Sequence, residues 1–139
     1  WHVLEHVHEP QRLLQKIAAR LNPQGTLCIA VPNANAADAA YYREYWAAYD
    51  VPRHLWHFKA EQMGALLEKF GFQLVEKKGM PFDAFYVSLM SEKYKKNPFW
   101  PIGGLYRGLI TIVKSFSNVD YSSSIIYIFQ LKKDRQIST

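Results

Sequence analysis

A short, uninterrupted apolar segment between two helical patterns constrains the fold of this chain most. The segment runs from Thr26 to Val31, and turn residues bound it on both sides, Asn22-Pro23-Gln24-Gly25 before it and Pro32-Asn33 after it. A continuous apolar run of this length predicts a strand that is buried on both faces, as strands of parallel sheets are. We therefore expect residues 26–31 to form an inner strand.

Helical patterns alternate with strands along the rest of the chain. Residues 10–21 place their apolar side chains on one stripe and begin at Pro10, a residue favoured at the first helical position. This order predicts an α/β layered fold with right-handed crossovers, ending in a tail, residues 132–139, that should fray. The further helices are expected at residues 35–49, 60–70, 83–96 and 98–117, and the further strands at 72–78 and 124–131.

Three strands are few for an open α/β sheet. Five or more are usual, and the first residues of the chain read as the end of a strand rather than as its start. We therefore expect residues 1–139 to be a single partial domain, the C-terminal part of a larger one, in which one sheet edge is exposed or paired with another molecule.

Composition excludes several classes of protein. Apolar residues make up 49% of the chain, which argues against intrinsic disorder. The single cysteine, Cys28, excludes an internal disulfide and a multi-cysteine metal site, and it favours a cytoplasmic setting. Cys28 lies within the expected inner strand, so we interpret it as a packing residue rather than as a nucleophile.

The net charge of +5 is unevenly distributed, because the basic excess lies in residues 91–139. Within them, residues 98–117 combine apolar side chains with Trp100, Arg107 and Lys114. This segment could contact a membrane surface or a protein, or it could pack in the core. Nucleic acid is not expected as a partner, because the basic residues do not belong to a recognisable binding motif. Self-association of the chain is left open.

Ionisable residues are concentrated in the first eight positions. His2-x-x-Glu5-His6 fits a zinc-hydrolase pattern, in which two histidines four residues apart on one helix bind zinc and the glutamate acts as general base. Pro10 starts a new helix almost at once, which leaves little room for the long helix that such a site needs. We therefore expect no resident metal, and we keep a zinc hydrolase as an alternative.

Several motifs resemble the class I S-adenosylmethionine-dependent methyltransferases, most closely their ubiquinone-biosynthesis-like branch. The order and spacing of these motifs agree from residue 3 to residue 72. The motifs are Val3-Leu4-Glu5-His6-Val7, Leu21-Asn22-Pro23-Gln24-Gly25-Thr26-Leu27, Ile29-Ala30-Val31-Pro32-Asn33, Pro52-x-His54-Leu55-x-x-Phe58 and Leu66-Leu67-x-x-Phe70-Gly71-Phe72.

This resemblance implies a fold and an activity. The fold would be the C-terminal part of a Rossmann-like methyltransferase sheet, from the end of the fourth strand to the seventh, with a helical insertion at about residues 81–120. The activity would be methyl transfer from S-adenosylmethionine to a small-molecule acceptor. The glycine-rich loop that holds this cofactor in the family is not among these residues, so we expect the 139 residues alone to be inactive. A cofactor-free interaction or membrane-surface module is the alternative from another class.

The resemblance also assigns roles to individual residues. Trp1, His2 and Val3 would line the cofactor pocket. Glu5 and His6 would face the acceptor, as a base or as an orienting pair, although local capping and loop hydrogen bonds would explain them equally well. Asn33 and His54 would contact the substrate, unless Asn33 only forms a turn and His54 only pins its loop. An aromatic group, Tyr41, Tyr42, Tyr45, Trp46 and Tyr49, would form a lid or pack in the core.

Overall fold

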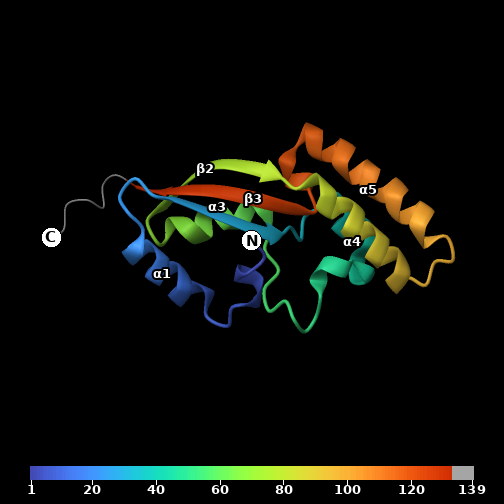
Figure 1. The fold of residues 1–139 in the computed structure, drawn as a ribbon, viewed down its shortest axis with the longest axis horizontal. Helices are drawn as coiled ribbons and strands as arrows, with labels where there is room; N and C mark the ends of the chain where they lie inside the picture. Colours follow the sequence, from blue (N-terminus) through green and yellow to red (C-terminus); the bar gives the residue numbers. More distant parts are fainter. Residues whose placement is uncertain (133–139) are drawn as a thin grey trace.

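The computed structural model describes residues 1–132, which form a three-stranded sheet, two helices below it and a helical hairpin at one end (Figure 1). The strands are β1 (Thr26–Pro32), β2 (Phe72–Gly79) and β3 (Ser124–Leu131), in the order β1-β3-β2. β3 pairs antiparallel with both neighbours, so β1 and β2 run parallel to each other on either side of it. The expected fraying of residues 133–139 lies outside the described residues.

The prediction for β1 is wrong in two respects. Its neighbour β3 is antiparallel, and only its second half, from Ile29, is buried, whereas Cys28 is exposed. The physical reason is that a continuous apolar run predicts burial but not the direction of the partner strand. In addition, β1 lies at the edge of the described sheet, where nothing covers its first residues.

One face of the sheet carries the main core. α1 (Pro10–Arg20) and α3 (Ala60–Glu68) pack against it through Leu14, Met63 and Leu67. Alternate residues of each strand point to this face, as the period of a strand requires. The opposite face remains exposed or half-buried over Cys28, Ile126, Ile128 and Gln130.

The expected helix at residues 35–49 is broken. It consists of α2 (Ala37–Tyr42) followed by two 3₁₀ turns, Arg43–Tyr45 and Ala47–Tyr49. Arg43 has φ 51°, in the left-handed region, and this residue interrupts the helix. Burial explains the break, because the interrupted chain places both Tyr42 and Trp46 in a second apolar cluster. Neither the helix propensity nor the composition of residues 35–49 indicates that both side chains are buried.

α4 (Pro81–Tyr94) and α5 (Trp100–Ser117) follow β2 and precede β3 in the sequence. The two helices lie side by side, and α5 is on the outer side (Figure 1). Gly104 permits this close approach, since a Cβ there would lie 2.7 Å from the Cα of Leu89. Glycines that weaken the helical pattern of residues 98–117 are therefore packing residues. Among the described residues, no helix has the length and apolarity needed to span a bilayer.

Candidate functional site

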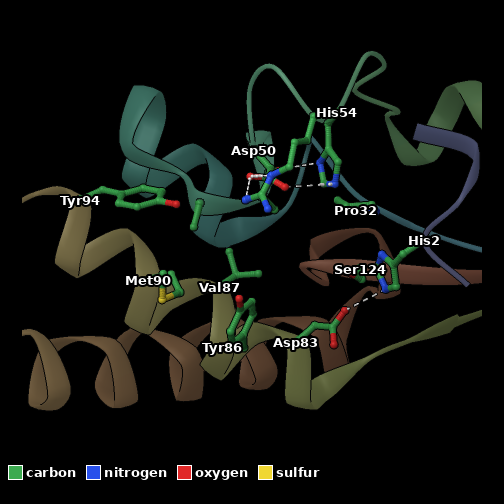
Figure 2. Close-up of a pocket in the computed structure, with 13 residues that line it drawn as sticks. His2, Pro32, Asp50, His54, Asp83, Tyr86, Val87, Met90, Tyr94 and Ser124 are labelled. Atoms are coloured by element: carbon green, nitrogen blue, oxygen red, sulfur yellow. Dashed lines mark hydrogen bonds and ion pairs between the residues drawn. The ribbon is translucent and has the colours of Figure 1, made fainter. Parts of the chain in front are cut away.

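A cavity of about 370 Å³ opens at the edge of the sheet where β1 ends and β3 begins (Figure 2). His2, Pro32 and Ser124 line it from the sheet side, and His54 lines it from the loop after η3 (Ala47–Tyr49). α4 closes the other side with Asp83, Tyr86, Val87, Met90 and Tyr94. His2 and Pro32 thus lie at the same edge of the sheet. Cationic, anionic, apolar and aromatic side chains all surround the space.

His2 lies between two carboxylates. Its Nδ1 is 3.2 Å from Glu5 Oε1, and its Nε2 is 3.4 Å from Asp83 Oδ2. Its backbone N–H donates to Ala30 O at 2.8 Å, which fixes this segment against β1. The interaction with Asp83, followed by that with Glu5, raises the pKa of His2 to about 9. His2 is therefore a cation at neutral pH, at the wall of the cavity.

Glu5 is the most unusual residue of the site, because its side chain is fully buried. Burial is the largest influence and raises the pKa of Glu5, but the hydrogen bond from His2, a backbone hydrogen bond and the charges of His2 and His54 together outweigh it, so the pKa of Glu5 is lowered. Glu5 Oε1 receives that hydrogen bond, whereas Oε2 has no hydrogen-bond partner. The backbone carbonyl of Glu5 accepts from the N–H of Leu55 at 2.7 Å. The carboxylate is thus ionised, buried and half-satisfied.

His6 and His54 lie beside this carboxylate with their ring centroids 4.7 Å apart. The Nδ1 atom of His6 is 2.9 Å from Arg53 O, and that of His54 is 2.8 Å from Ala48 O. A carbonyl can only accept, so each Nδ1 carries the proton and each Nε2 keeps a lone pair in the neutral ring. Glu5, His6 and His54 each offer one ligand atom, all within 4.8 Å of one another.

The zinc pattern of the sequence does not form as expected. Residues Leu4–His6 form a short 3₁₀ turn, and His2, with φ 50°, lies outside it. His2 is bonded to Glu5 instead of sharing a helical face with His6. Within the described residues, the group that could hold a metal contains His54 in place of His2.

The two residues expected to act on the acceptor lie behind the cavity wall. Glu5 and His6 are not among the residues that line the cavity, whereas His2 and His54 are. Glu5 reaches the cavity through one hydrogen bond to His2. Glu5 and His6 thus lie close to His2 and His54, but only His2 and His54 line the cavity. Their catalytic roles remain predictions.

Trp1 and Val3, the other expected cofactor contacts, expose apolar side chains. Trp1 is 64% and Val3 57% exposed. Together with His2 they border a shallow apolar groove, to which α1 and β1 contribute Leu13 and Leu27. Since His2 lines both this groove and the larger cavity, the two spaces meet at that residue.

Asn33 is buried, and both polar atoms of its side-chain amide form hydrogen bonds with backbone groups. Nδ2 donates to Asp120 O and Ser122 O, and Oδ1 accepts from the N–H groups of Asn35 and Ala60. Asn33 therefore joins the end of β1 to the segments before β3 and α3. It is not among the residues that line the cavity, and its predicted contact with substrate remains a prediction.

The aromatic residues at positions 41–49 do not form a wall of the cavity, and Tyr41 and Tyr45 are exposed. Tyr42 and Trp46 are buried against Val87, and none of the five rings lines the cavity. The residues of this segment that line the cavity are Ala47 and Ala48. Sequence reasoning missed the α4 residues Asp83, Tyr86 and Met90, because no motif marks a wall that the tertiary fold supplies.

Comparison with known proteins identifies one family and one fold. A family model described as a methyltransferase domain matches residues 1–77. The structure is similar to the crystal structure of the [4+2]-cyclase SpnF, with a TM-score of 0.54 and 17% sequence identity over 94% of this chain and 48% of that chain. The chain therefore spans about half the length of this neighbour, and the likeness shows a Rossmann-like methyltransferase fold. No curated protein matches the sequence.

Proposed function

Because this chain belongs to the family of methyltransferase domains, we propose that it is part of an S-adenosylmethionine-dependent enzyme that methylates a small-molecule acceptor. The observation that carries this proposal is the cavity itself. It joins a cationic His2, the ring of His54 and an apolar wall from α4 in one space of about 370 Å³. Small-molecule sites typically combine an apolar lining with a few convergent polar groups in this way.

Residues 1–3 fit a role in holding the cofactor. Trp1 and Val3 offer exposed apolar surface beside a groove, and their neighbour His2 also lines the acceptor cavity. A cofactor bound over Trp1 and Val3 would therefore lie next to the acceptor, as methyl transfer requires. When bound, S-adenosylmethionine supplies an electrophilic methyl group from its sulfonium.

The acceptor would be oriented from two sides. Tyr86, Val87 and Met90 of α4 provide apolar contacts. His54 would present Nε2, which lies 3.9 Å from Asp50 Oδ2, to a hydroxyl or amino hydrogen of the acceptor. Glu5 acts behind the wall as a positioning residue, since its carboxylate fixes the ring of His2 through Nδ1. His6 supports His54 by edge-to-face contact.

We further propose that the chain is the C-terminal portion of a longer enzyme of the ubiquinone-biosynthesis-like branch. Its coverage of only 48% of SpnF supports this proposal, as does the resemblance of Val3-Leu4-Glu5-His6-Val7 to that branch. The exposed sheet face over Cys28 and Ile128 offers a surface against which preceding chain would pack.

The experiment incubates the full-length protein with S-adenosylmethionine tritiated in its methyl group and a small-molecule extract. We expect label to accumulate in an organic or low-mass fraction in proportion to enzyme and time. Absence of transfer to any small molecule, together with labelling of protein or nucleic acid, would contradict the proposal. Heat-treated protein provides the control for chemical methylation.

A further inference from the structure

Asp83 brings a carboxylate to the wall of the cavity. It lies in the first turn of α4, lines the cavity, and its side chain is 29% exposed. Figure 2 shows it beside His2 and Ser124, at one end of the space. The family match ends at residue 77, before α4 begins, so membership of the family does not decide which acceptor group would face Asp83.

The carboxylate of Asp83 is ionised at neutral pH. Burial is the largest influence on its pKa and raises it, but the hydrogen bonds from His2 and Ser124 and the charge of His2 together outweigh burial, so the pKa is lowered. Glu5, in η1 (Leu4–His6), holds the other nitrogen of the His2 ring. Asp83 is thus fixed in place by a cation that is itself fixed from behind.

The cations at this cavity are already paired with carboxylates. His2 is shared between Glu5 at 3.2 Å and Asp83 at 3.4 Å. Arg53 donates from Nε and Nη2 to Asp50 Oδ1, at 3.1 and 2.6 Å. Among the described residues at this cavity, three carboxylates therefore face two cations. An anionic acceptor would find each cation engaged and would be repelled by the excess carboxylate, whereas a cationic acceptor would balance it.

The aromatic side chains of α4 also suit a cation. Tyr86 and Tyr94 line the cavity and are 68% and 50% exposed, so their rings are accessible to a ligand. Tyr86 is three residues beyond Asp83, which places both side chains on the same face of the helix. A protonated nitrogen held by Asp83 would therefore lie within reach of the face of a tyrosine ring, which attracts ammonium groups.

We propose that the acceptor is a small primary or secondary amine with an apolar body, and that its nitrogen contacts the carboxylate of Asp83. The apolar body would lie along Tyr86 and Met90, farther along α4. Asp83 is then a catalytic residue, because it touches the reacting group, and His2 is the positioning residue that holds it. This inference rests on the proposed function, since it names the atom that would be methylated.

Charge balance favours nitrogen over oxygen beside this carboxylate. The bound ammonium gives one proton to His54 Nε2, which lines the same cavity, and this leaves a lone pair on nitrogen. The lone pair forms the bond to the methyl carbon, while the carbon–sulfur bond breaks and its electron pair stays on sulfur. The positive charge thus passes to nitrogen, where Asp83 stabilises it. An oxygen acceptor would instead develop negative charge beside Asp83, which the carboxylate opposes.

The test is calorimetric titration of the full-length protein with three probes of similar shape and different charge. They are 2-phenylethylamine, which is a cation at neutral pH, 2-phenylethanol and 3-phenylpropanoate. We expect the amine to bind at least about tenfold more tightly than the alcohol, because it gains a charge-assisted hydrogen bond, and the carboxylate to bind weakest.

Asp83→Asn should change the order of the three probes. Amine binding should weaken about tenfold or more, alcohol binding should stay within about twofold, and 3-phenylpropanoate should bind more tightly because His2 loses one of its carboxylates. Asp120→Asn is the matched control. Asp120 also pairs with a cation, Lys77, but it does not line the cavity, so all three affinities should be unchanged.

A second variant keeps the test valid if Asp83→Asn does not fold. Tyr86→Leu retains an apolar side chain but removes the ring, so it should weaken amine binding about threefold and leave alcohol binding unchanged. Tighter binding of the alcohol or of the carboxylate to the unmodified protein would overturn the inference. Equal loss of amine and alcohol in Asp83→Asn would do the same, because it would indicate a structural role only.

Methyl transfer to the same probes separates this inference from the proposed function. Transfer to the alcohol but not to the amine would support the proposed function and overturn the inference. Preferential amine binding without transfer to any compound would support the assignment of the cavity to amines and count against the proposed function.

Discussion

Two buried carboxylates, Asp38 in α2 and Glu5 in η1, are satisfied to different degrees. Asp38 accepts hydrogen bonds on both oxygens, from Ser123 Oγ and from the N–H of Ala39. Glu5 accepts one on Oε1, from His2, and Oε2 has no partner. Burial raises the pKa of Asp38, whereas in Glu5 the interactions with His2, a backbone hydrogen bond and the charge of His54 together outweigh burial and lower the pKa.

We interpret this difference as one between a structural carboxylate and a carboxylate of the candidate site. A fully satisfied group needs nothing further, so Asp38 serves to join α2 to the segment before β3. A half-satisfied ionised group is a cost that folding alone does not explain. We therefore interpret Glu5 as a positioning residue, whose carboxylate holds His2 at the wall of the cavity.

The largest expected effect is that of Glu5→Gln on methyl transfer. We expect turnover to fall at least about 100-fold, because the variant loses the charge that holds and orients His2. The free energy of unfolding should stay within about 1 kcal/mol, since a buried unpaired charge is removed. Steady-state kinetics and urea unfolding measure the two quantities. Retained turnover would contradict the distinction drawn between the carboxylates.

Ser123→Ala should show the reverse pattern. Removing the hydroxyl leaves Asp38 Oδ2 buried without its donor, which should lower the free energy of unfolding by about 2 kcal/mol. Turnover per folded molecule should not change. Ser115→Ala is the control, because Ser115 donates only to Ile112 O within α5 and should cost about 0.5 kcal/mol or less. Urea unfolding distinguishes these values, and equal losses would refute the role given to Asp38.

A smaller effect is expected at the α4 wall of the cavity. Met90→Ala should raise the KM for the acceptor about fivefold, because an apolar contact worth about 1 kcal/mol is lost. Phe82→Ala is the matched control on the same helix, since Phe82 is 83% exposed and does not line the cavity. Acceptor saturation curves provide the measurement. An unchanged KM in Met90→Ala would remove α4 from the acceptor site.

The smallest expected effect is the pH dependence contributed by Asp38. Its folded-state pKa is raised, mainly by burial, above the unfolded value of about 4. The contribution of protonated Asp38 to the free energy of unfolding is thus fully present below about pH 4, and it is lost as the pH rises through the folded-state pKa. Asp38→Asn cannot titrate and should show a flatter stability profile over this range in urea unfolding. A steeper profile in the variant would contradict the sign.

Local patterns predicted the elements of this fold well but not their partners. The helix that begins at Pro10 and the strands β2 and β3 follow from periodicity and turn residues. The antiparallel direction of β3 and the exposure of Cys28 depend on tertiary neighbours, which no local pattern encodes. Likewise, the break at Arg43 follows from the burial of Trp46.

The sequence predicted which residues belong to the candidate site better than it predicted how those residues are arranged. The sequence singled out Glu5, His6 and His54. However, it grouped Glu5 and His6 with His2, in the zinc pattern His2-x-x-Glu5-His6. The loop that carries His54 approaches η1 through backbone hydrogen bonds, which sequence spacing cannot reveal. Asp83 was missed for the same reason, because only the packing of α4 brings it to His2.

The central claim is that this chain belongs to an enzyme that binds S-adenosylmethionine beside His2. Calorimetric titration of the full-length protein with S-adenosylmethionine tests it most directly. We predict one cofactor per chain, with an affinity that Glu5→Gln leaves within about threefold, because Glu5 is not among the residues that border the groove of Trp1 and Val3. No saturable binding of S-adenosylmethionine would contradict the account.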